Sequence, residues 1–367
     1  MVVAHLASGS PLDKLTHMRG IDGATGFVLL SGLVLGMVHS RAAREPQPGA
    51  PGTRDRPTQS AMLRLARRGA LVWFVHVLLV LFAVLTAPWS DKRLGIPNDA
   101  TPAGIGEWPR LLWLVTTLQV SPNKVGVLAL YVLFFGSVVV GIVLLRAGRL
   151  KTLVSLSALA YAAGAIVESS WWSLSRYPGE ETHFNVAMWQ ALFVSGLVIG
   201  WQWHPGRLDQ LFTRRRTTLL AATGCAALVL LAQPLGDSPL LAAWPEAAGP
   251  LEAFFAKYDL GPGRILLGWC LFALLYAVVR HTEHMAAGAL AHTTFLDIGR
   301  RSLDGYVLLT LMFLALFVLA PYELDSMTGM LWAAAGLVLV RAWAALRASY
   351  DGRRPSRPRD AVLAGTP

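Results

Sequence analysis

Charged residues and cysteine are both scarce in this sequence. Only 15% of the 367 residues are charged, whereas 54% are hydrophobic. Soluble domains carry about 25% charged residues, so the composition excludes an ordinary soluble protein and indicates an integral membrane protein. The two cysteines, Cys225 and Cys270, lie inside apolar runs without a basic neighbour, which excludes a disulfide framework and argues against an activated thiol.

Acidic residues are scarcer than basic ones. The chain has 22 acidic and 32 basic residues, which give a formal charge of +10. The basic residues form short clusters between apolar runs, so membrane topology accounts for them and a nucleic-acid partner is not expected. The N-terminus also lacks the pattern of a cleavable signal peptide, in which a basic region, an apolar core and a small-residue cleavage site follow one another.

Long apolar runs cover nearly half of the sequence. A membrane-spanning helix needs about 20 mostly apolar residues. The runs that meet this condition cover residues 24–41, 69–88, 125–145, 150–170, 185–203, 217–234, 264–280, 303–320 and 329–346. The sequence therefore predicts an all-α fold, a polytopic transmembrane helix bundle embedded in the lipid bilayer within residues 1–346. A basic tail at 347–367 is expected to be cytoplasmic and disordered.

One apolar segment, residues 108–120, is too short to span a bilayer. It is predicted to form an interfacial or re-entrant helix, with Trp108 and Trp113 as anchors at the membrane surface. Among the spanning runs, Gly32 and Gly36 form a GxxxG pair, and Gly196 and Gly200 form another. Such pairs predict close packing between helices.

Every second link between the apolar runs is strongly basic. These links are residues 41–68, 146–151 and 207–216, together with the C-terminal tail. Because Lys and Arg gather on the cytoplasmic side of a membrane, these links and the C-terminus are placed in the cytoplasm. Nine spans then place the N-terminus outside, and MVVAHLA is expected to be the outer end of a tenth helix that begins upstream of Met1.

Several polar side chains are predicted to gather at the outer end of the bundle. Ionisable groups in spans are costly and are therefore candidates for a functional site. A histidine, carboxylates, amides, an arginine and tryptophans in one vestibule suit group transfer to a sugar. The alternative is that the charged groups reach water at helix ends and that the tryptophans belong to an aromatic belt. The candidates are His5, Asp22, Glu168, Trp172, Asn185, Gln190 and Arg264.

The inner side offers a weaker candidate. The stretch HTEHMAAGALAHTTFLD contains three histidines, and His292 and Asp297 have the H-x4-D spacing of glycerolipid acyltransferases. A metal site, a loop that contacts the phosphates of a cytoplasmic donor, and a simply solvated loop are further interpretations. His76, in the middle of its run, is expected to be an interhelical hydrogen-bond partner and not a catalyst.

Three stretches have a more specific pattern. They are SPLDKLTHMRGIDGATGFVLLSGLVLGMVHSR at 10–41, HFNVAMWQALFVSGLVIG at 183–200 and LDIGRRSLDGYVLLT at 296–310. In this order they resemble the OpgC family, membrane proteins that acylate osmoregulated periplasmic glucans, and the similarity runs from residue 1 to about 345. The OpgC family is similar to the wider acyltransferase-3 superfamily of ten-helix membrane enzymes.

The resemblance implies an O-acyltransferase in the bacterial inner membrane. Its donor substrate would be acyl-CoA, with no bound cofactor, and its acceptor a periplasmic glucan or similar saccharide. His5 falls at the family's key histidine and is expected to be the general base. Ala4 stands where the family has an acidic residue, Arg301 stands where Asn or His is usual, and the family's first-helix arginine would lie before Met1.

Supporting roles are expected for the other outer candidates. Asp22, Glu168 or Arg264 would orient the histidine or hold the acceptor, and Asn185 and Gln190 would donate hydrogen bonds to the acyl oxygen. Two other functions suit a polytopic protein with buried polar groups: a transporter or flippase for a polar glycan or lipid, and a non-catalytic membrane subunit.

Overall fold

The computed structural model describes most of the chain. The described residues are 23–44, 56–86, 107–120, 125–167, 184–203, 210–211, 214–232, 245–282, 285, 302–319 and 326–352. Within these ranges the regular structure is α-helical and no strand occurs, which confirms the predicted fold class.

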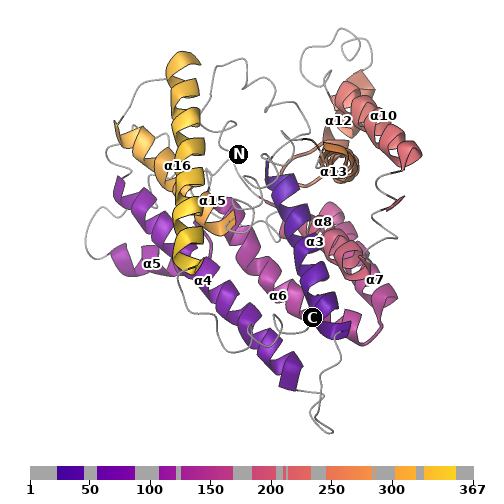
Figure 1. Cartoon of the computed structure of the whole chain (residues 1–367), viewed down its shortest axis with the longest axis horizontal. Helices are drawn as coiled ribbons and strands as arrows, with labels where there is room; N and C mark the ends of the chain where they lie inside the picture. Colours follow the sequence, from indigo (N-terminus) through magenta and orange to yellow (C-terminus); the bar gives the residue numbers. More distant parts are fainter. Residues whose placement is uncertain are drawn as a thin grey trace.

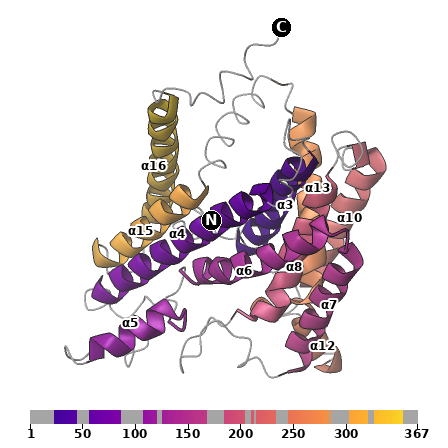
Figure 2. The same cartoon turned by 90° about the horizontal axis from the view of Figure 1, so that it is seen from below.

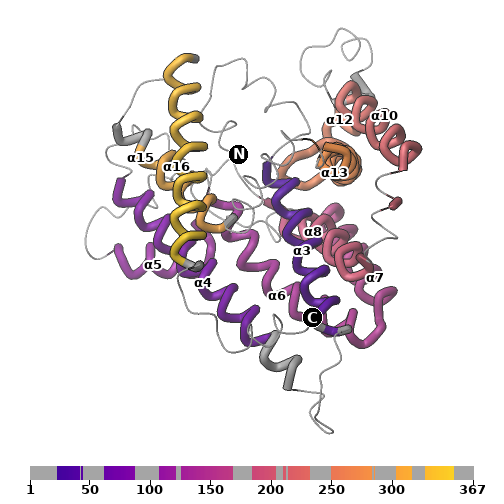
Figure 3. The backbone as a smooth tube through the Cα atoms, in the orientation of Figure 1, coloured from indigo at the N-terminus to yellow at the C-terminus, as the bar shows by residue number. Residues whose placement is uncertain are grey.

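Every apolar run predicted from the sequence overlaps a helix. The helices are α3 (Gly23–Arg44), α4 (Arg56–Thr86), α5 (Trp108–Thr116), α6 (Gly126–Arg146), α7 (Leu150–Ile166), α8 (Val186–Gln202), α10 (Arg215–Ala232), α12 (Pro245–Phe254), α13 (Pro262–Thr282), α15 (Ser302–Leu319) and α16 (Ser326–Gly352). In Figure 1, α3, α6 and α8 lie at the centre, α4, α5, α15 and α16 on one side, and α7, α10, α12 and α13 on the other. The tube in Figure 3 shows the same path along the chain.

Five of the described helices are long and apolar enough to cross a membrane, namely α3, α4, α6, α13 and α16. α7 and α8 are apolar but have only 17 residues each, which gives them a length of about 26 Å, somewhat less than a hydrocarbon core of about 30 Å. The structure therefore shows a membrane protein with several apolar helices. The nine spans and the tenth helix upstream stay predictions.

The predicted glycine pairs meet at one crossing, between α3 and α8. A Cβ atom at Gly32 would overlap the carbonyl oxygen of Phe193, and one at Gly200 would overlap the carbonyl oxygen of Leu33. Figure 2 shows the two helices side by side, and their contact is extensive. Only glycine permits this approach of two backbones, so the structure confirms the close packing that the GxxxG spacing predicts.

The core lies between α3, α4, α6 and α8. Its centre contains the fully buried Trp189, and the Phe134 and Phe193 rings stack with centroids 5.0 Å apart. Tyr131 of α6 donates a hydrogen bond to the Phe27 carbonyl oxygen of α3, 2.8 Å away. The stacked rings hold α6 against α8, and the Tyr131 bond holds α6 against α3.

The segment 108–120 forms the short helix α5, as predicted. α5 is tied to α4 because Trp73 Nε1 donates to the Thr116 carbonyl oxygen over 2.9 Å. The indole of Trp113 is 65% exposed, whereas Trp108 packs against the core. Of the two anchors predicted for the membrane surface, Trp113 is therefore the more exposed.

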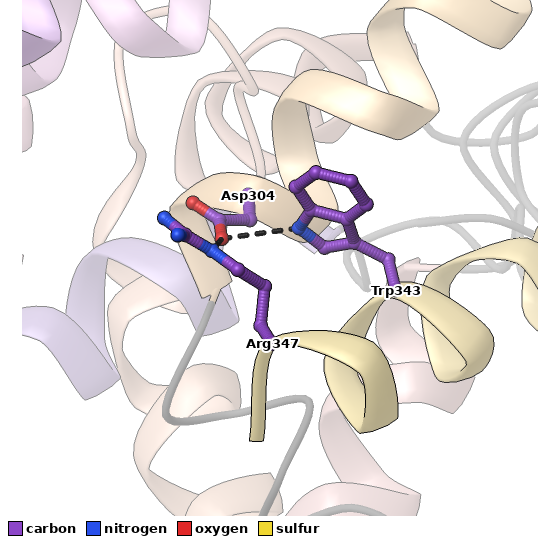
Figure 4. A network of polar contacts seen from close by, with 3 residues as sticks. All are labelled: Asp304, Trp343 and Arg347. Carbon is purple, nitrogen blue, oxygen red and sulfur yellow. Dashed lines mark hydrogen bonds and ion pairs between the residues drawn. The ribbon is translucent and has the colours of Figure 1, made fainter. Parts of the chain in front are cut away.

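A polar cluster joins α15 to α16 (Figure 4). Trp343 Nε1 donates to Asp304 Oδ2 over 3.1 Å, and Arg347 Nε lies 3.7 Å from the same oxygen. The start of α15 and the last turns of α16 therefore lie at the same end of the molecule. α16 continues to Gly352, past the predicted boundary at 346.

Candidate functional site

Four of the predicted site residues lie outside the described residues. They are His5, Asp22, Glu168 and Trp172. α3 begins directly after Asp22 in the sequence, and Val167 is the last described residue before Glu168. The structure describes Asn185 and Gln190, at the cap and in the first two turns of α8, and Arg264, in the first turn of α13.

Asn185 is the N-cap of α8 and is fully buried. Its Oδ1 accepts a hydrogen bond from the Met188 backbone N–H over 3.3 Å, the interaction that favours asparagine at this position. Its Nδ2 donates to the Gly164 carbonyl oxygen of α7 over 2.9 Å and to Asp259 Oδ1 over 3.3 Å. One side chain therefore joins the end of α7, the start of α8 and the segment before α13.

The start of α8 also holds the backbone at Tyr258. The Asn185 backbone N–H donates to the Tyr258 carbonyl oxygen over 3.0 Å, and Trp189 Nε1 donates to the same oxygen over 2.9 Å. The Phe184 ring packs edge-on against Trp189, with centroids 5.1 Å apart. Asn185 and Trp189 belong to the stretch that resembles the F-N-x-x-x-W-Q helix of the OpgC family, and here they bind the protein's own backbone.

Gln190 pairs with Ser157 of α7. Ser157 Oγ donates to Gln190 Oε1 over 2.9 Å, and Gln190 Nε2 donates to the Ser157 carbonyl oxygen over 2.8 Å. These bonds join α7 to α8. The expected hydrogen bonds from Asn185 and Gln190 to a substrate stay a prediction, but in this structure both amides hold the scaffold together.

Arg264 lies in the first turn of α13 and is 8% exposed. Its Nε donates to the Phe255 carbonyl oxygen over 2.7 Å. A Cβ atom at Gly261 would overlap the Phe254 and Ala253 carbonyl oxygens, so the chain turns sharply back on the end of α12 here. Arg264 thus supports the backbone turn between α12 and α13.

The residues between α12 and α13, 255–261, form a compact segment that we call the acidic turn, after Asp259. Leu260 has a φ of 43°, in the left-handed region, although it is a fully buried leucine. The Tyr161 hydroxyl of α7 donates to its carbonyl oxygen over 3.0 Å. A non-glycine residue in this conformation costs free energy, and such strain is concentrated at functional sites.

An open pocket of about 630 Å³ lies beside the acidic turn. Its walls come from the last turns of α7, the start of α8, α12, the acidic turn and the first residue of α13. We call it the outer pocket, because the predicted topology places it at the outer end of the bundle. Asp259 is exposed at this pocket, and its Oδ2 accepts no hydrogen bond from the described residues.

The sequence did not predict Asp259 as a site residue. It lies in a link of mixed charge, and the stretch KYDLGPG shows only that a turn precedes a helix. An acidic residue at such a turn is common, and its proximity to Asn185 depends on a contact across 74 positions of sequence.

A second, apolar cavity of about 250 Å³ lies between α3 and α13. It is bounded by the first turns of α3 and by one face of α13 between Leu267 and Val279. A Cβ atom at Gly26 would meet no atom within 4 Å. The cavity is therefore open in front of Gly26, on the helix whose later glycines are tightly packed.

Most of the inner candidates are not described by the structure and stay predictions. His281 lies in the last turn of α13, whereas His284, His292 and Asp297 lie outside the described residues. The part of the chain that the structure describes contains no group of His, Cys, Asp and Glu that could hold a metal ion. His76 is fully buried in α4, and its ring lies next to the Val125 backbone at the start of α6. Its expected role as an interhelical hydrogen-bond partner stays a prediction.

Comparison with known proteins gives one family. The search of curated proteins found no match, and neither did the search of solved structures. A family model described as OpgC protein matches residues 1–352, nearly the whole chain. Together with the apolar helices, this match shows that the chain is a membrane protein that belongs to the OpgC family.

Proposed function

We propose that this protein is a membrane-bound acyltransferase of the OpgC type. It would move an acyl group, such as succinyl, from acyl-CoA to a hydroxyl group of a periplasmic glucan or similar saccharide. The observation that carries the proposal is the family match over residues 1–352. The outer pocket supports it, because it offers a site for an acceptor at the end of the bundle that the predicted topology places outside.

His5 would act as the general base in this reaction. A neutral imidazole takes the proton of the acceptor hydroxyl near pH 7. The hydroxyl oxygen then attacks the thioester carbonyl carbon, the new C–O bond forms and the C–S bond breaks. The thiolate of coenzyme A leaves and takes up the proton from His5. The position of His5 in the family pattern supports this role.

The donor would approach from the cytoplasmic side. α6 ends at Arg146, and Arg149 and Lys151 follow within the next link. Positive charge at this end would attract the phosphate groups of coenzyme A. Asp22, Glu168, Trp172 and Arg264 are on the predicted acceptor side, where the first three would contact the saccharide or orient His5.

The experiment is an assay of the purified full chain in lipid nanodiscs with labelled succinyl-CoA and a linear glucan. We expect transfer of label to the glucan by the wild type and a loss of at least about 100-fold in His5→Ala, since general acid–base catalysis contributes about 10²–10⁴-fold. Thr223→Ala, at an exposed position of α10 that belongs to no candidate site, is the control and should retain activity.

Two results would contradict these assignments. A folded wild type that transfers no acyl group from any tested acyl-CoA would remove the acyltransferase proposal. Full activity of His5→Ala would remove only the general-base role of that residue.

A further inference from the structure

We propose that Asp259 is an acceptor-binding residue, whose carboxylate accepts a hydrogen bond from a hydroxyl group of a saccharide in the outer pocket. The identity of the saccharide as the acyl acceptor rests on the proposed function. The binding site itself rests on the geometry of the acidic turn and of the pocket.

The backbone on both sides of Asp259 is held in place. The Tyr258 carbonyl oxygen accepts two hydrogen bonds from the start of α8, and the Leu260 carbonyl oxygen accepts one from Tyr161 of α7. At the other end of the turn, Arg264 binds the Phe255 carbonyl oxygen. A carboxylate on so constrained a segment loses little conformational freedom when a ligand binds, which favours affinity.

The Asp259 carboxylate is oriented with one oxygen left for a ligand. Asn185 Nδ2 lies 3.3 Å from Oδ1, and Oδ2 accepts no hydrogen bond from the described residues. An ionised carboxylate has about four lone-pair sites, and its hydrogen bonds with hydroxyl donors are stronger than those between neutral groups. Asp259 can therefore accept a ligand hydroxyl while Asn185 keeps its orientation.

The rest of the outer pocket suits a ring with an apolar face. Its lining includes Phe254, Met188 and Ile166, together with the prolines 250 and 262. The volume of about 630 Å³ is within the usual range for small-ligand sites of about 300–1,000 Å³. A saccharide presents hydroxyl groups at its edge and C–H groups on its faces, so it can satisfy a carboxylate and apolar walls together.

The test measures binding of a short linear glucan oligosaccharide to the purified full chain by isothermal titration calorimetry. Asp259→Asn removes the charge at constant shape and should weaken binding about tenfold or more, because hydrogen bonds to charged groups contribute more than neutral ones. Glu252→Gln is the matched control. It removes an exposed carboxylate from α12 that does not line the pocket, so binding should be unchanged.

A second variant tests the pocket independently of the turn. Ala165 is exposed and lines the pocket, so Ala165→Trp should fill the space and weaken binding without disturbing the core. Glucan affinity that is unchanged in both Asp259→Asn and Ala165→Trp would overturn the site. Displacement of a bound phospholipid, with no heat of glucan binding, would overturn it as well.

Kinetics separate this proposal from the proposed function. In the acyl-transfer assay, Asp259→Asn should raise the KM for the glucan about tenfold and leave the KM for acyl-CoA unchanged. Transfer with an unchanged glucan KM would overturn the role of Asp259 and leave the acyltransferase proposal intact. The folded wild type could also bind glucan in a way that depends on Asp259 and yet transfer no acyl group. That result would overturn the acyltransferase proposal alone.

Discussion

Asn185 shows how much structure one buried amide can organise. Its backbone N–H, its Oδ1 and its Nδ2 make hydrogen bonds to the acidic turn, to α8 and to α7. An amide suits this position because it both donates and accepts, whereas a carboxylate only accepts when it is ionised. Satisfied polar networks of this kind fix a unique arrangement of the core, and the removal of one member leaves its partners unsatisfied.

We expect Asn185→Asp to destabilise the protein by about 2–4 kcal/mol, although the two side chains have the same shape. The change removes the hydrogen-bond donor to the Gly164 carbonyl oxygen, and a lost bond to a buried group costs about 1–3 kcal/mol. It also places a second carboxylate beside Asp259, and the two negative charges repel each other. The measurement is thermal unfolding of the detergent-purified protein, followed by tryptophan fluorescence. Thr152→Ala, at an exposed position of α7, is the control and should stay within about 0.5 kcal/mol of the wild type. A stable Asn185→Asp would show that the network does not hold the turn.

Asn185, Gln190 and Arg264 were predicted as site residues from their residue type alone. Polar groups within apolar runs are unusual, and that signal is local. The hydrogen-bond partners of these groups are distant in the sequence. Gln190 binds Ser157, which is 33 positions away, and Asn185 binds Asp259, which is 74 positions away. For this reason the sequence could identify candidate residues of the site but not Asp259, and it could not distinguish a substrate contact from a scaffold contact.

At the scale of helices, α3 has two different surfaces. Its middle and later turns meet α8 through glycines, with no room for a Cβ atom, whereas its first turns border the apolar cavity at Gly26. The spacing of the glycines predicted the tight surface, but it did not identify α8 as the partner across the bundle. The apolar runs predicted the helices well, because hydrophobic length is set by the bilayer and not by the particular neighbours of a helix.

We expect opposite effects of two glycine substitutions on this one helix. Gly32→Ala forces α3 and α8 apart and should cost at least about 3 kcal/mol, the upper end of the range for overpacking. Gly26→Ala fills open space and should leave stability unchanged or raise it by up to about 1 kcal/mol, through the higher helix propensity of alanine. Thermal unfolding and size-exclusion chromatography of both variants in detergent give the comparison. Equal effects would contradict the packing described for α3.

At the scale of the whole molecule, one described contact brings two helix ends together. The contact between Asp304 and Arg347 places the start of α15 and the end of α16 at one end of the bundle. The predicted topology, which rests on the basic links and on a count of nine spans, assigns both of these ends to the cytoplasm. The acidic turn, between α12 and α13, falls in a link that this topology places outside.

Cysteine labelling in intact bacterial cells tests this orientation. In a chain with Cys225 and Cys270 replaced by alanine, we expect Lys257→Cys, an exposed position of the acidic turn, to react with a membrane-impermeant maleimide. Arg149→Cys, an exposed position between α6 and α7, should react only after the cells are permeabilised. The reverse pattern would invert the topology and would place the outer pocket in the cytoplasm.

The double hydrogen bond to the Tyr258 carbonyl oxygen has a consequence for sequence variation among related proteins. Both donors of α8 bind a backbone carbonyl group, which every amino acid has. These two bonds therefore do not constrain the residue type at position 258. They constrain the residues that donate the bonds instead, above all Trp189, whose side chain must supply an indole N–H. In an alignment of relatives, position 189 should therefore hold its tryptophan more strictly than position 258 holds its tyrosine, although the two positions take part in the same contact.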